Sequence, residues 1–359
     1  MDRFLIATDC SPARADRPTV ERLLADGRLL WLDVGEPDPE SLAWLREVFG
    51  VHPVALKAVA EFGQRPKAET FGDMTYLVTY GARGRGGALT EVHCFYSTRF
   101  LVTMRCDRCP ALDELREHLT ALVGQDGQLP GGQLPGPRRP PQLILLHHIM
   151  SGLFDSFFPV LSDFDDRIDE LQERIFVRPG DRELVELFSM QRWLVGLRKL
   201  VTPQRDMMAS LVSGMTSLPG MVPESEPYVR DLYDHLIRIS DLVDSYRDLI
   251  SGAMDAYLSI MSNRLNTVMK QLAIIATVFL PLSFLTGFFG QNFGWLQEHL
   301  GSLAAFVVFG LGAEAVVVGV LFLLFRQRGW ISLARSPGPD GRIAAPVAAE
   351  DWTQRAGVA

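Results

Sequence analysis

Cysteine is scarce in this sequence, with only four among 359 residues: Cys10, Cys94, Cys106 and Cys109. They are too few and too irregularly spaced to form a disulfide framework in a chain of this length. Cys106 and Cys109 make a lone CxxC pair, with no second pair and no histidine at a familiar ligand spacing. The sequence therefore favours a plain loop after a strand over a metal or redox site at this pair.

A long apolar run is missing near the beginning of the sequence. Charged residues such as Asp2, Arg3 and Asp9 recur there, so the apolar core of a secretory signal peptide does not form. We therefore expect the N-terminal region to stay in the cytoplasm.

Basic residues are fewer than acidic ones. The sequence has 35 Lys and Arg against 43 Asp and Glu, which gives a formal net charge of −8 at pH 7. An acidic balance argues against a nucleic-acid partner and is compatible with a protein that gathers cations. We do not expect the protein to be an enzyme, and we assign no catalytic residues.

Charge is absent from Leu272 to Phe289. Roughly 20 apolar residues suffice to cross ~30 Å of hydrocarbon at ~1.5 Å rise per residue, so residues 272–289 predict a first membrane helix. A short loop without Lys or Arg (290–302) leads to a second apolar run at 303–325. The two runs predict a hairpin of membrane helices.

Basic residues flank this hairpin on one side only. Arg264 and Lys270 precede the first run, and Arg326 and Arg328 follow the second. The positive-inside rule then places both long termini in the cytoplasm and the 290–302 loop outside, as in a multi-pass protein of the cell (inner) membrane. Residues 326–359 form a proline-containing tail that we expect to be mostly disordered.

Ahead of the membrane part, residues 1–123 predict an α/β domain. Apolar, branched runs indicate strands at 28–34, 71–80, 91–96 and 99–105, and the spacing near 3.6 indicates a helix from residue 39. Residues 124–141 are so rich in Gly and Pro that neither helix nor strand is expected to persist. The fold class is therefore an α+β membrane protein with a cytoplasmic α/β domain.

Helical periodicity returns over 142–227 and predicts an antiparallel helix pair. His147 and His148 lie in this pair, and without a visible third ligand they favour helix packing over metal binding. The next segment has no proline until Pro281, so one helix is expected from Tyr228 to Phe289, with residues 228–271 as a stalk below the membrane.

Aspartates recur along this long helix at intervals of seven residues. The row is Asp234, Asp241, Asp248 and Asp255, with Asp231 and Asp244 beside it, and the same register continues through Ser262, Met269, Ala276 and Ser283. A heptad repeat keeps one face toward a common axis when helices associate. Carboxylates on such an axis repel one another unless cations lie between them, which indicates a cation funnel. The alternative is a solvated face on a long helix.

The run MKQLAIIATVFLPLSFLTGFFGQNF resembles the first membrane helix of the CorA family of divalent-cation channels. The family signature at the outer end of that helix is Gly-Met-Asn, and here it reads Gly290, Gln291 and Asn292. The resemblance extends upstream, through the stalk to the N-terminal region, and covers nearly all of the chain up to about Trp330.

This resemblance implies a homopentamer in which the first membrane helix lines a pore. The selectivity filter is then Gly290, Gln291 and Asn292, whose neutral oxygens contact the water shell that Mg²⁺ holds tightly. Asn266 supplies a second ring near the cytoplasmic mouth. The implied pore lining comprises Asn266, Met269, Leu272, Ala276, Leu280 and Ser283, and its apolar members can gate by dewetting. Glu298 in the outer loop is expected to concentrate cations.

The resemblance also implies regulation by internal Mg²⁺, with a departure in this chain. The family carries Glu-Asp shortly after a His-Pro pair, and that acid meets a stalk aspartate of the next subunit across a bound Mg²⁺. Here Lys57 and Ala58 follow His52-Pro53, while the stalk residue is retained as Asp231. We therefore expect weak inhibition by Mg²⁺, with Lys57 pairing directly with Asp231.

Glu314 lies in the middle of the second apolar run. An ionised carboxylate at bilayer depth is costly, so such a residue is protonated, paired or faces protein. Ser283 and Thr286 of the first run are the expected hydrogen-bond donors. The alternative is that Glu314 couples protons to metal movement.

Three functions remain open from the sequence. The first is a pore for divalent cations, with Mg²⁺ as substrate. The second is a Zn²⁺, Co²⁺ or Ni²⁺ transporter, since a neighbouring branch that resembles ZntB keeps Gly-x-Asn with another middle residue. The third is a membrane-anchored metal sensor that does not conduct. The expected partners are divalent cations, further copies of the chain and the lipid membrane, with no nucleic acid.

Overall fold

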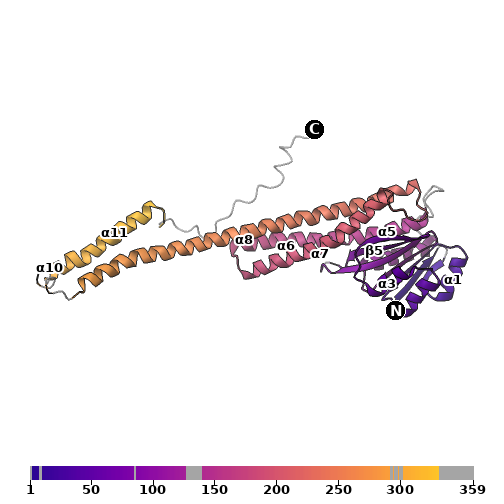
Figure 1. Ribbon diagram of the computed structural model, residues 1–359, viewed down its shortest axis with the longest axis horizontal. Helices are drawn as coiled ribbons and strands as arrows, with labels where there is room; N and C mark the ends of the chain where they lie inside the picture. The colour runs from indigo at the N-terminus through magenta and orange to yellow at the C-terminus, as the bar shows by residue number, and fades with distance from the viewer. Residues whose placement is uncertain are drawn as a thin grey trace, which may run out of the picture. The chain divides into compact units, whose positions relative to one another are not determined.

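The computed structural model describes residues 2–7, 10–84, 86–126, 140–291, 294, 298 and 302–330. The chain divides into two compact units, Met1–Ile260 (unit 1) and Met261–Ala359 (unit 2). Figure 1 shows the helices and strands of each unit.

Unit 1 contains a mixed sheet with the strand order β2-β1-β3-β7-β6-β5-β4. Its strands are β1 (Asp2–Ala7), β2 (Cys10–Arg14), β3 (Leu30–Gly35), β4 (Lys67–Phe71), β5 (Met74–Ala82), β6 (Leu89–Ser97) and β7 (Phe100–Arg105). Only β3 and β7 pair in parallel, with Leu32 opposite Val102. Strands β5 and β7 are buried along their whole length, as expected where both faces of a sheet are covered.

Four helices accompany the sheet in the N-terminal half of unit 1: α1 (Arg17–Ala25), α2 (Pro39–Glu47), α3 (Pro53–Glu61) and α4 (Pro110–Asp126). Helices α1, α2 and α3 each begin with a proline at the first turn and a side-chain cap, from Asp16, Asp38 and His52 respectively. The predicted α/β domain is confirmed, and α4 continues through Asp126. The expectation of no helix over 124–141 is therefore wrong at its start, because α4 ends only after Gly124.

The helices cover both faces of the sheet. One face carries Asp33, whose carboxylate lies 3.5 Å from Arg116 of α4, and the other carries His93, whose ring centroid lies 4.6 Å from that of Phe62 after α3. Gly81 of β5 lets α5 come close, because an added Cβ would lie 2.9 Å from Cδ2 of Leu153. The core of unit 1 is therefore a three-layer arrangement of helices, sheet and helices.

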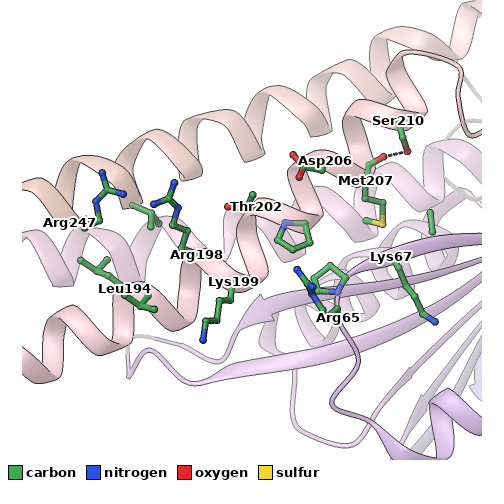
Figure 2. A pocket seen from close by; sticks show the side chains of 15 residues that line it. Arg65, Lys67, Leu194, Arg198, Lys199, Thr202, Asp206, Met207, Ser210 and Arg247 are labelled. Atoms are coloured by element: carbon green, nitrogen blue, oxygen red, sulfur yellow. Dashed lines mark hydrogen bonds between the residues drawn. The ribbon is translucent and has the colours of Figure 1, made fainter.

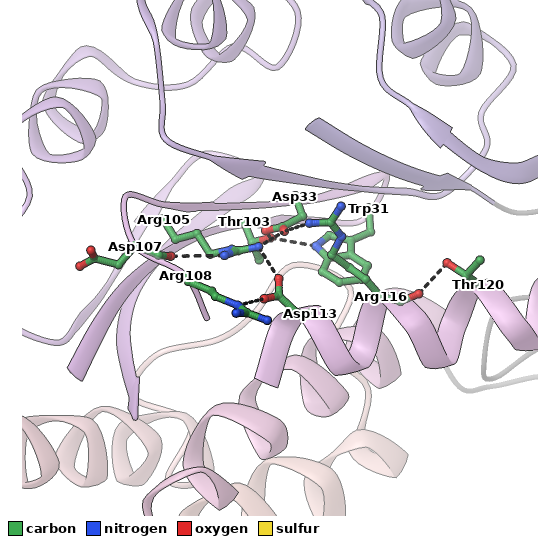
Figure 3. Close-up of polar contacts among 9 residues, drawn as sticks. All are labelled: Trp31, Asp33, Thr103, Arg105, Asp107, Arg108, Asp113, Arg116 and Thr120. Carbon is green, nitrogen blue, oxygen red and sulfur yellow. Dashed lines mark hydrogen bonds and ion pairs between the residues drawn. The ribbon is translucent and has the colours of Figure 1, made fainter. Parts of the chain in front are cut away.

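A buried ion-pair network joins α4 to the sheet (Figure 3). Arg105 Nη2 lies 3.3 Å from Asp33 Oδ2 and 2.8 Å from Asp113 Oδ1, and Thr103 Oγ1 donates to Asp33 Oδ1 at 2.6 Å. Burial raises the pKa of Asp33, while the Arg105 guanidinium acts in the opposite direction. Each charge has partners, as the interior of a protein requires, and this network has a structural role.

A helical layer completes unit 1. It comprises α5 (Pro141–Asp155), α6 (Phe157–Val177) and α7 (Asp181–Val212), and a 3₁₀ turn (Pro223–Ser225) leads into α8 (Glu226–Phe289). The first helix of the pair predicted over 142–227 is thus two helices, α5 and α6, that meet at Ser156. Buried Gln204 of α7 accepts hydrogen bonds from Thr79 Oγ1 at 2.7 Å and from the Tyr80 amide at 2.8 Å, which holds α7 on β5.

Unit 2 contains the end of α8, a short helix α10 (Leu303–Ala305), a π-helical segment (Phe306–Leu311) and α11 (Gly312–Gln327). Lys270 Nζ lies 5.9 Å from the ring centroid of Trp330. The continuous α-helix expected over 303–325 is therefore interrupted by π-helical turns and extends to Gln327. Most of the predicted disordered tail, residues 331–359, lies outside the described residues.

Candidate functional site

The first half of α8 packs against unit 1 along one side. Its buried residues alternate between spacings of three and four, the pattern of a heptad seam. Nine of them form this seam: Val229, Leu232, Leu236, Ile239, Val243, Tyr246, Ile250, Ala253 and Tyr257. Tyr246 contacts the ring of Phe164 on α6 at 5.7 Å between centroids. The seam fixes which side of α8 remains free.

The predicted aspartate row lies on that free side. Asp234, Asp241, Asp248 and Asp255 each follow a seam residue by two positions, about 200° around the helix at ~100° per residue. All four are exposed. Asp248 lies 3.1 Å from Arg247, whereas the other three have no ion pair or hydrogen bond within the part of the chain that the structure describes. Unit 1 therefore presents a largely uncompensated line of carboxylates.

Asp244, beside the row, has a different environment. Its Oδ1 lies 3.4 Å from Arg198 Nη1 of α7 and 3.6 Å from Arg247 Nη1. This carboxylate is therefore engaged inside unit 1 and is not available on the free side of α8.

Asp231 contacts two histidines of its own chain. Its Oδ2 lies 2.8 Å from His147 Nε2 and its Oδ1 lies 3.9 Å from His235 Nε2, while His235 Nδ1 lies 3.0 Å from Asp155 Oδ1. His147 also packs against Tyr228 at 5.3 Å, in line with the helix-packing role expected for it. Lys57, the expected partner of Asp231 across subunits, lies 3.8 Å from Glu61 in its own helix. Sequence reasoning missed this cluster because its members lie far apart in the chain.

Clusters of metal-binding side chains are absent from the described residues of a single chain. No set of three or more His, Cys, Asp or Glu side chains there has metal-binding geometry. Cys94, Cys106 and Cys109 are free; Cys106 is exposed, and burial raises the pKa of Cys109 to about 11.

Helix α8 ends at the expected position. The Gly290 amide donates to the Thr286 carbonyl at 2.9 Å, and a Cβ at Gly290 would lie 2.9 Å from that same oxygen, so this position requires glycine. Gln291 is exposed, as is Glu298, while Asn292 lies outside the described residues. The structure thus accounts for Gly290 and leaves the role of Asn292 a prediction.

The candidate pore residues are uncovered within one chain. Met269, Leu272 and Leu280 are 63%, 59% and 75% exposed, and Asn266, Ala276 and Ser283 are exposed as well. Exposed apolar side chains in such number on a helix indicate contact with lipid or another protein chain.

Within the described residues, three helical stretches are long and apolar enough to cross a membrane: Pro141–Val177, Pro223–Phe289 and Val307–Gln327. In the first, 56% of the apolar window is buried inside unit 1, whereas none of the window is buried in the other two. The first stretch is therefore part of the core, and the other two are the candidate spans.

Glu314 lies in the first turn of α11, directly after the π-helical segment, and is half-buried. Among the described residues it has no hydrogen bond or ion pair. Thr286, expected as its donor, instead donates its hydroxyl to the carbonyls of Leu282 at 2.9 Å and Ser283 at 3.1 Å. This part of the prediction is wrong, because the threonine hydroxyl bonds to its own helix.

Comparison with known proteins extends this picture. A solved structure of the CorA magnesium transporter from Methanocaldococcus jannaschii aligns with a TM-score of 0.77 over 92% of this chain and 99% of that chain, at 21% identity, which shows a shared fold. The cobalt/magnesium transport protein CorA of Thermotoga maritima is 32% identical over 289 residues, covering 79% of this chain and 78% of that protein. The divalent cation transporter CmaX of Pseudomonas aeruginosa is 28% identical over 312 residues, covering 84% and 87% respectively.

The family model and the curated relatives together define the class as a metal ion transporter of the CorA type. The family model for the CorA-like Mg²⁺ transporter protein matches residues 26–327. The chain therefore belongs to the CorA-like Mg²⁺ transporter family, and the resemblance read from the sequence is confirmed.

Proposed function

We propose that this chain is one subunit of a homopentameric pore that carries divalent cations, with Mg²⁺ as its main substrate, across the inner membrane. Residues 272–289 of α8 and residues 303–325 are the two membrane spans, and both termini lie in the cytoplasm. The pore axis runs along the free side of α8. Membership of the CorA-like family supports this assignment.

The observation that carries the proposal is the position of the aspartate row. The row lies opposite the packed seam of α8, and steps of seven residues from Asp255 lead along the same helix to Ser262, Met269, Ala276 and Ser283. Along this seven-residue register the helix is thus acidic at first and neutral where charge disappears, and a left-handed supercoil of associated helices keeps such a register toward their common axis. A ring of copies would attract cations with the acidic part and pass them along the neutral part.

The chemistry at the end of the pore suits Mg²⁺. This ion binds oxygen ligands and sheds its water reluctantly, so a filter that passes it quickly needs neutral acceptors that touch bound water. The Gly290 carbonyl and the amides of Gln291 and Asn292 provide such acceptors around a symmetric axis. Asn266 provides another ring, and Leu272 and Leu280 form apolar constrictions between them.

Metal uptake into liposomes that contain the purified protein tests this function. Wild type should take up Mg²⁺, Gln291→Met should keep most of the uptake because either side chain leaves the water shell intact, and Asn292→Ala should lose most of it. Equal uptake by Asn292→Ala and wild type would remove the filter assignment. No uptake of any divalent metal by wild type would favour the membrane-anchored sensor.

Glu314 favours a second candidate, a proton-coupled transporter of Zn²⁺, Co²⁺ or Ni²⁺. It is a carboxyl residue within a candidate span, next to π-helical turns, a feature often found at functional sites. Metal flux measured with and without an imposed pH gradient separates the two. A gradient effect that disappears in Glu314→Gln supports coupling, and indifference to the gradient in both proteins leaves Glu314 a structural role.

A further inference from the structure

A cavity of about 600 Å³ opens in unit 1 between the loop before β4, helix α7 and helix α8 (Figure 2). Leu194, Met207 and Val243 contribute apolar, buried walls. Its volume lies in the range of small-molecule sites, which are largely apolar with a few polar groups that fix orientation.

Cations dominate the polar lining of this cavity. The lining contains one carboxylate, Asp206. It contains five cationic side chains: Arg65, Lys67, Arg198, Lys199 and Arg247. A cavity of this charge repels the metal ions that the protein is proposed to transport. It is suited to an anion.

Three of the five cations already have carboxylate partners. Lys67 lies 3.0 Å from Glu69, Arg198 lies 3.4 Å from Asp244, and Arg247 lies 3.1 Å from Asp248. The one lining carboxylate, Asp206, is paired with Arg205 at 3.1 Å.

Arg65 and Lys199 are the two lining cations that have no carboxylate partner among the described residues. Neither has a hydrogen bond or an ion pair to any residue that the structure describes, and they come from opposite walls, the loop before β4 and helix α7 (Figure 2). Two unpaired positive charges that line one cavity match a ligand with a charge near −2.

The loop that carries Arg65 is held in place by a buried carboxylate. Glu91 accepts hydrogen bonds from the Gly63 amide at 2.6 Å and the Gln64 amide at 3.0 Å, and Tyr80 donates its hydroxyl to the Gln64 carbonyl at 2.6 Å. Pro66, the next residue, is buried. A fixed loop presents its arginine at a lower entropic cost than a mobile one.

The opposite wall offers an acceptor. Pro203 of α7 has no amide hydrogen, so it does not donate to the Lys199 carbonyl four residues earlier. A hydroxyl or amino group of a ligand can use this carbonyl. The adjacent Gln204 fixes α7 on β5 through the two hydrogen bonds to Thr79 and Tyr80.

We propose that this cavity binds an organic phosphate monoester. Its phosphate, with a charge of about −1.5 to −2 at pH 7, lies between Arg65 and Lys199, and its apolar or planar body lies against Leu194, Met207 and Val243. Such an ester is either a soluble metabolite of the nucleoside phosphate type or a lipid with a phosphate monoester head.

Equilibrium dialysis of the purified full-length protein with labelled AMP, in Mg²⁺-free buffer, tests this proposal. AMP should bind, and Arg65→Gln and Lys199→Gln should each weaken binding about tenfold, the usual effect of losing one charged hydrogen bond. Asp206→Asn should tighten binding, because it removes the only lining carboxylate. Arg192→Gln and Lys57→Gln are matched controls outside the lining and should leave binding unchanged.

Competitors identify which part of the ligand matters. If dihexanoyl phosphatidic acid displaces labelled AMP at a far lower concentration than unlabelled AMP does, the ligand of the site is a lipid phosphate monoester. If inorganic phosphate competes as well as unlabelled AMP does, the apolar walls do not contribute to binding and that part of the proposal is wrong. Absence of AMP and phosphatidic acid binding, or equal loss in the control variants, overturns the site. No metal is present, so these results do not depend on transport.

Discussion

Glu91 shows how one buried residue can determine the position of a loop. It lies on β6, 8% exposed, and binds two loop amides, the Tyr80 hydroxyl at 2.9 Å and His93 at 2.8 Å. Burial acts to raise the pKa of Glu91, but the hydrogen bonds from His93, Gln64 and Gly63 outweigh it and hold the pKa below its ordinary value. The charged form is thus the one that the fold stabilises.

This pKa predicts acid sensitivity. Because the folded pKa is depressed, the stability that Glu91 contributes is complete above the ordinary value of 4.5 and is lost as the pH falls through the lower folded value. Glu91→Gln should cost about 1–3 kcal/mol at pH 7, the usual penalty for a buried group left with poor partners. Thermal unfolding of both proteins at several pH values measures this. A difference in midpoint that does not narrow in acid would contradict the account.

Lys57 and Asp231 predict weak control by internal Mg²⁺. A lysine stands where the family resemblance implies an acid, and Asp231 already lies 2.8 Å from His147, so we expect this pair to have little affinity for a bridging cation. Patch-clamp recordings should show little closure by millimolar internal Mg²⁺ in wild type, and Lys57→Glu should increase it. Strong closure in wild type that disappears in Asp231→Ala is the contrary result.

At the scale of the element, α8 combines two faces with different tasks. The seam residue Ile239 is fully buried, whereas Asp241, two residues later, is exposed on the opposite side. Ile239→Ala should therefore destabilise unit 1 by about 2–5 kcal/mol, while Asp241→Ala should change its stability by less than about 0.5 kcal/mol. Hydrogen exchange of the α8 amides in the intact protein measures both. Similar effects of the two substitutions would show that the assigned seam is not the packed side.

The elements that sequence patterns predicted are those with a local signal. The strands β3, β5, β6 and β7 carry apolar, branched runs, and α8 carries an uninterrupted heptad. Strands β1 and β2 were missed because residues 2–14 mix charges with apolar residues, and their pairing depends on β3, which is distant in sequence. Helix α3 also has a local signal, Pro53 at its first turn.

The candidate sites divide in the same way. The aspartate row and Gly290 follow from spacing along one helix, so the sequence was sufficient to find them. The contact of His147 with Asp231 and the cavity between Arg65 and Lys199 join residues that only the fold brings together. Local sequence patterns do not predict such contacts, because the chain between two distant residues can fold in many ways.

At the scale of the whole molecule, each unit has a distinct composition of surface. Unit 1 buries most of its large apolar side chains and exposes the aspartate row, whereas unit 2 exposes apolar side chains along both candidate spans. A single chain with such a surface is incomplete in water. In the pentameric membrane pore proposed above, lipid and neighbouring copies of the chain would cover this surface.

The most direct test of the central claim is Mg²⁺ flux through Ala276→Cys, measured in liposomes before and after a cationic methanethiosulfonate reagent. Ala276 belongs to the register of the aspartate row, and Val278 lies about 200° around the same helix at ~100° per residue. The account predicts that the reagent stops most of the flux in Ala276→Cys and leaves Val278→Cys and wild type, with its native cysteines, unaffected. Equal block in Ala276→Cys and Val278→Cys, or no block in either, would contradict a pore lined by this side of α8.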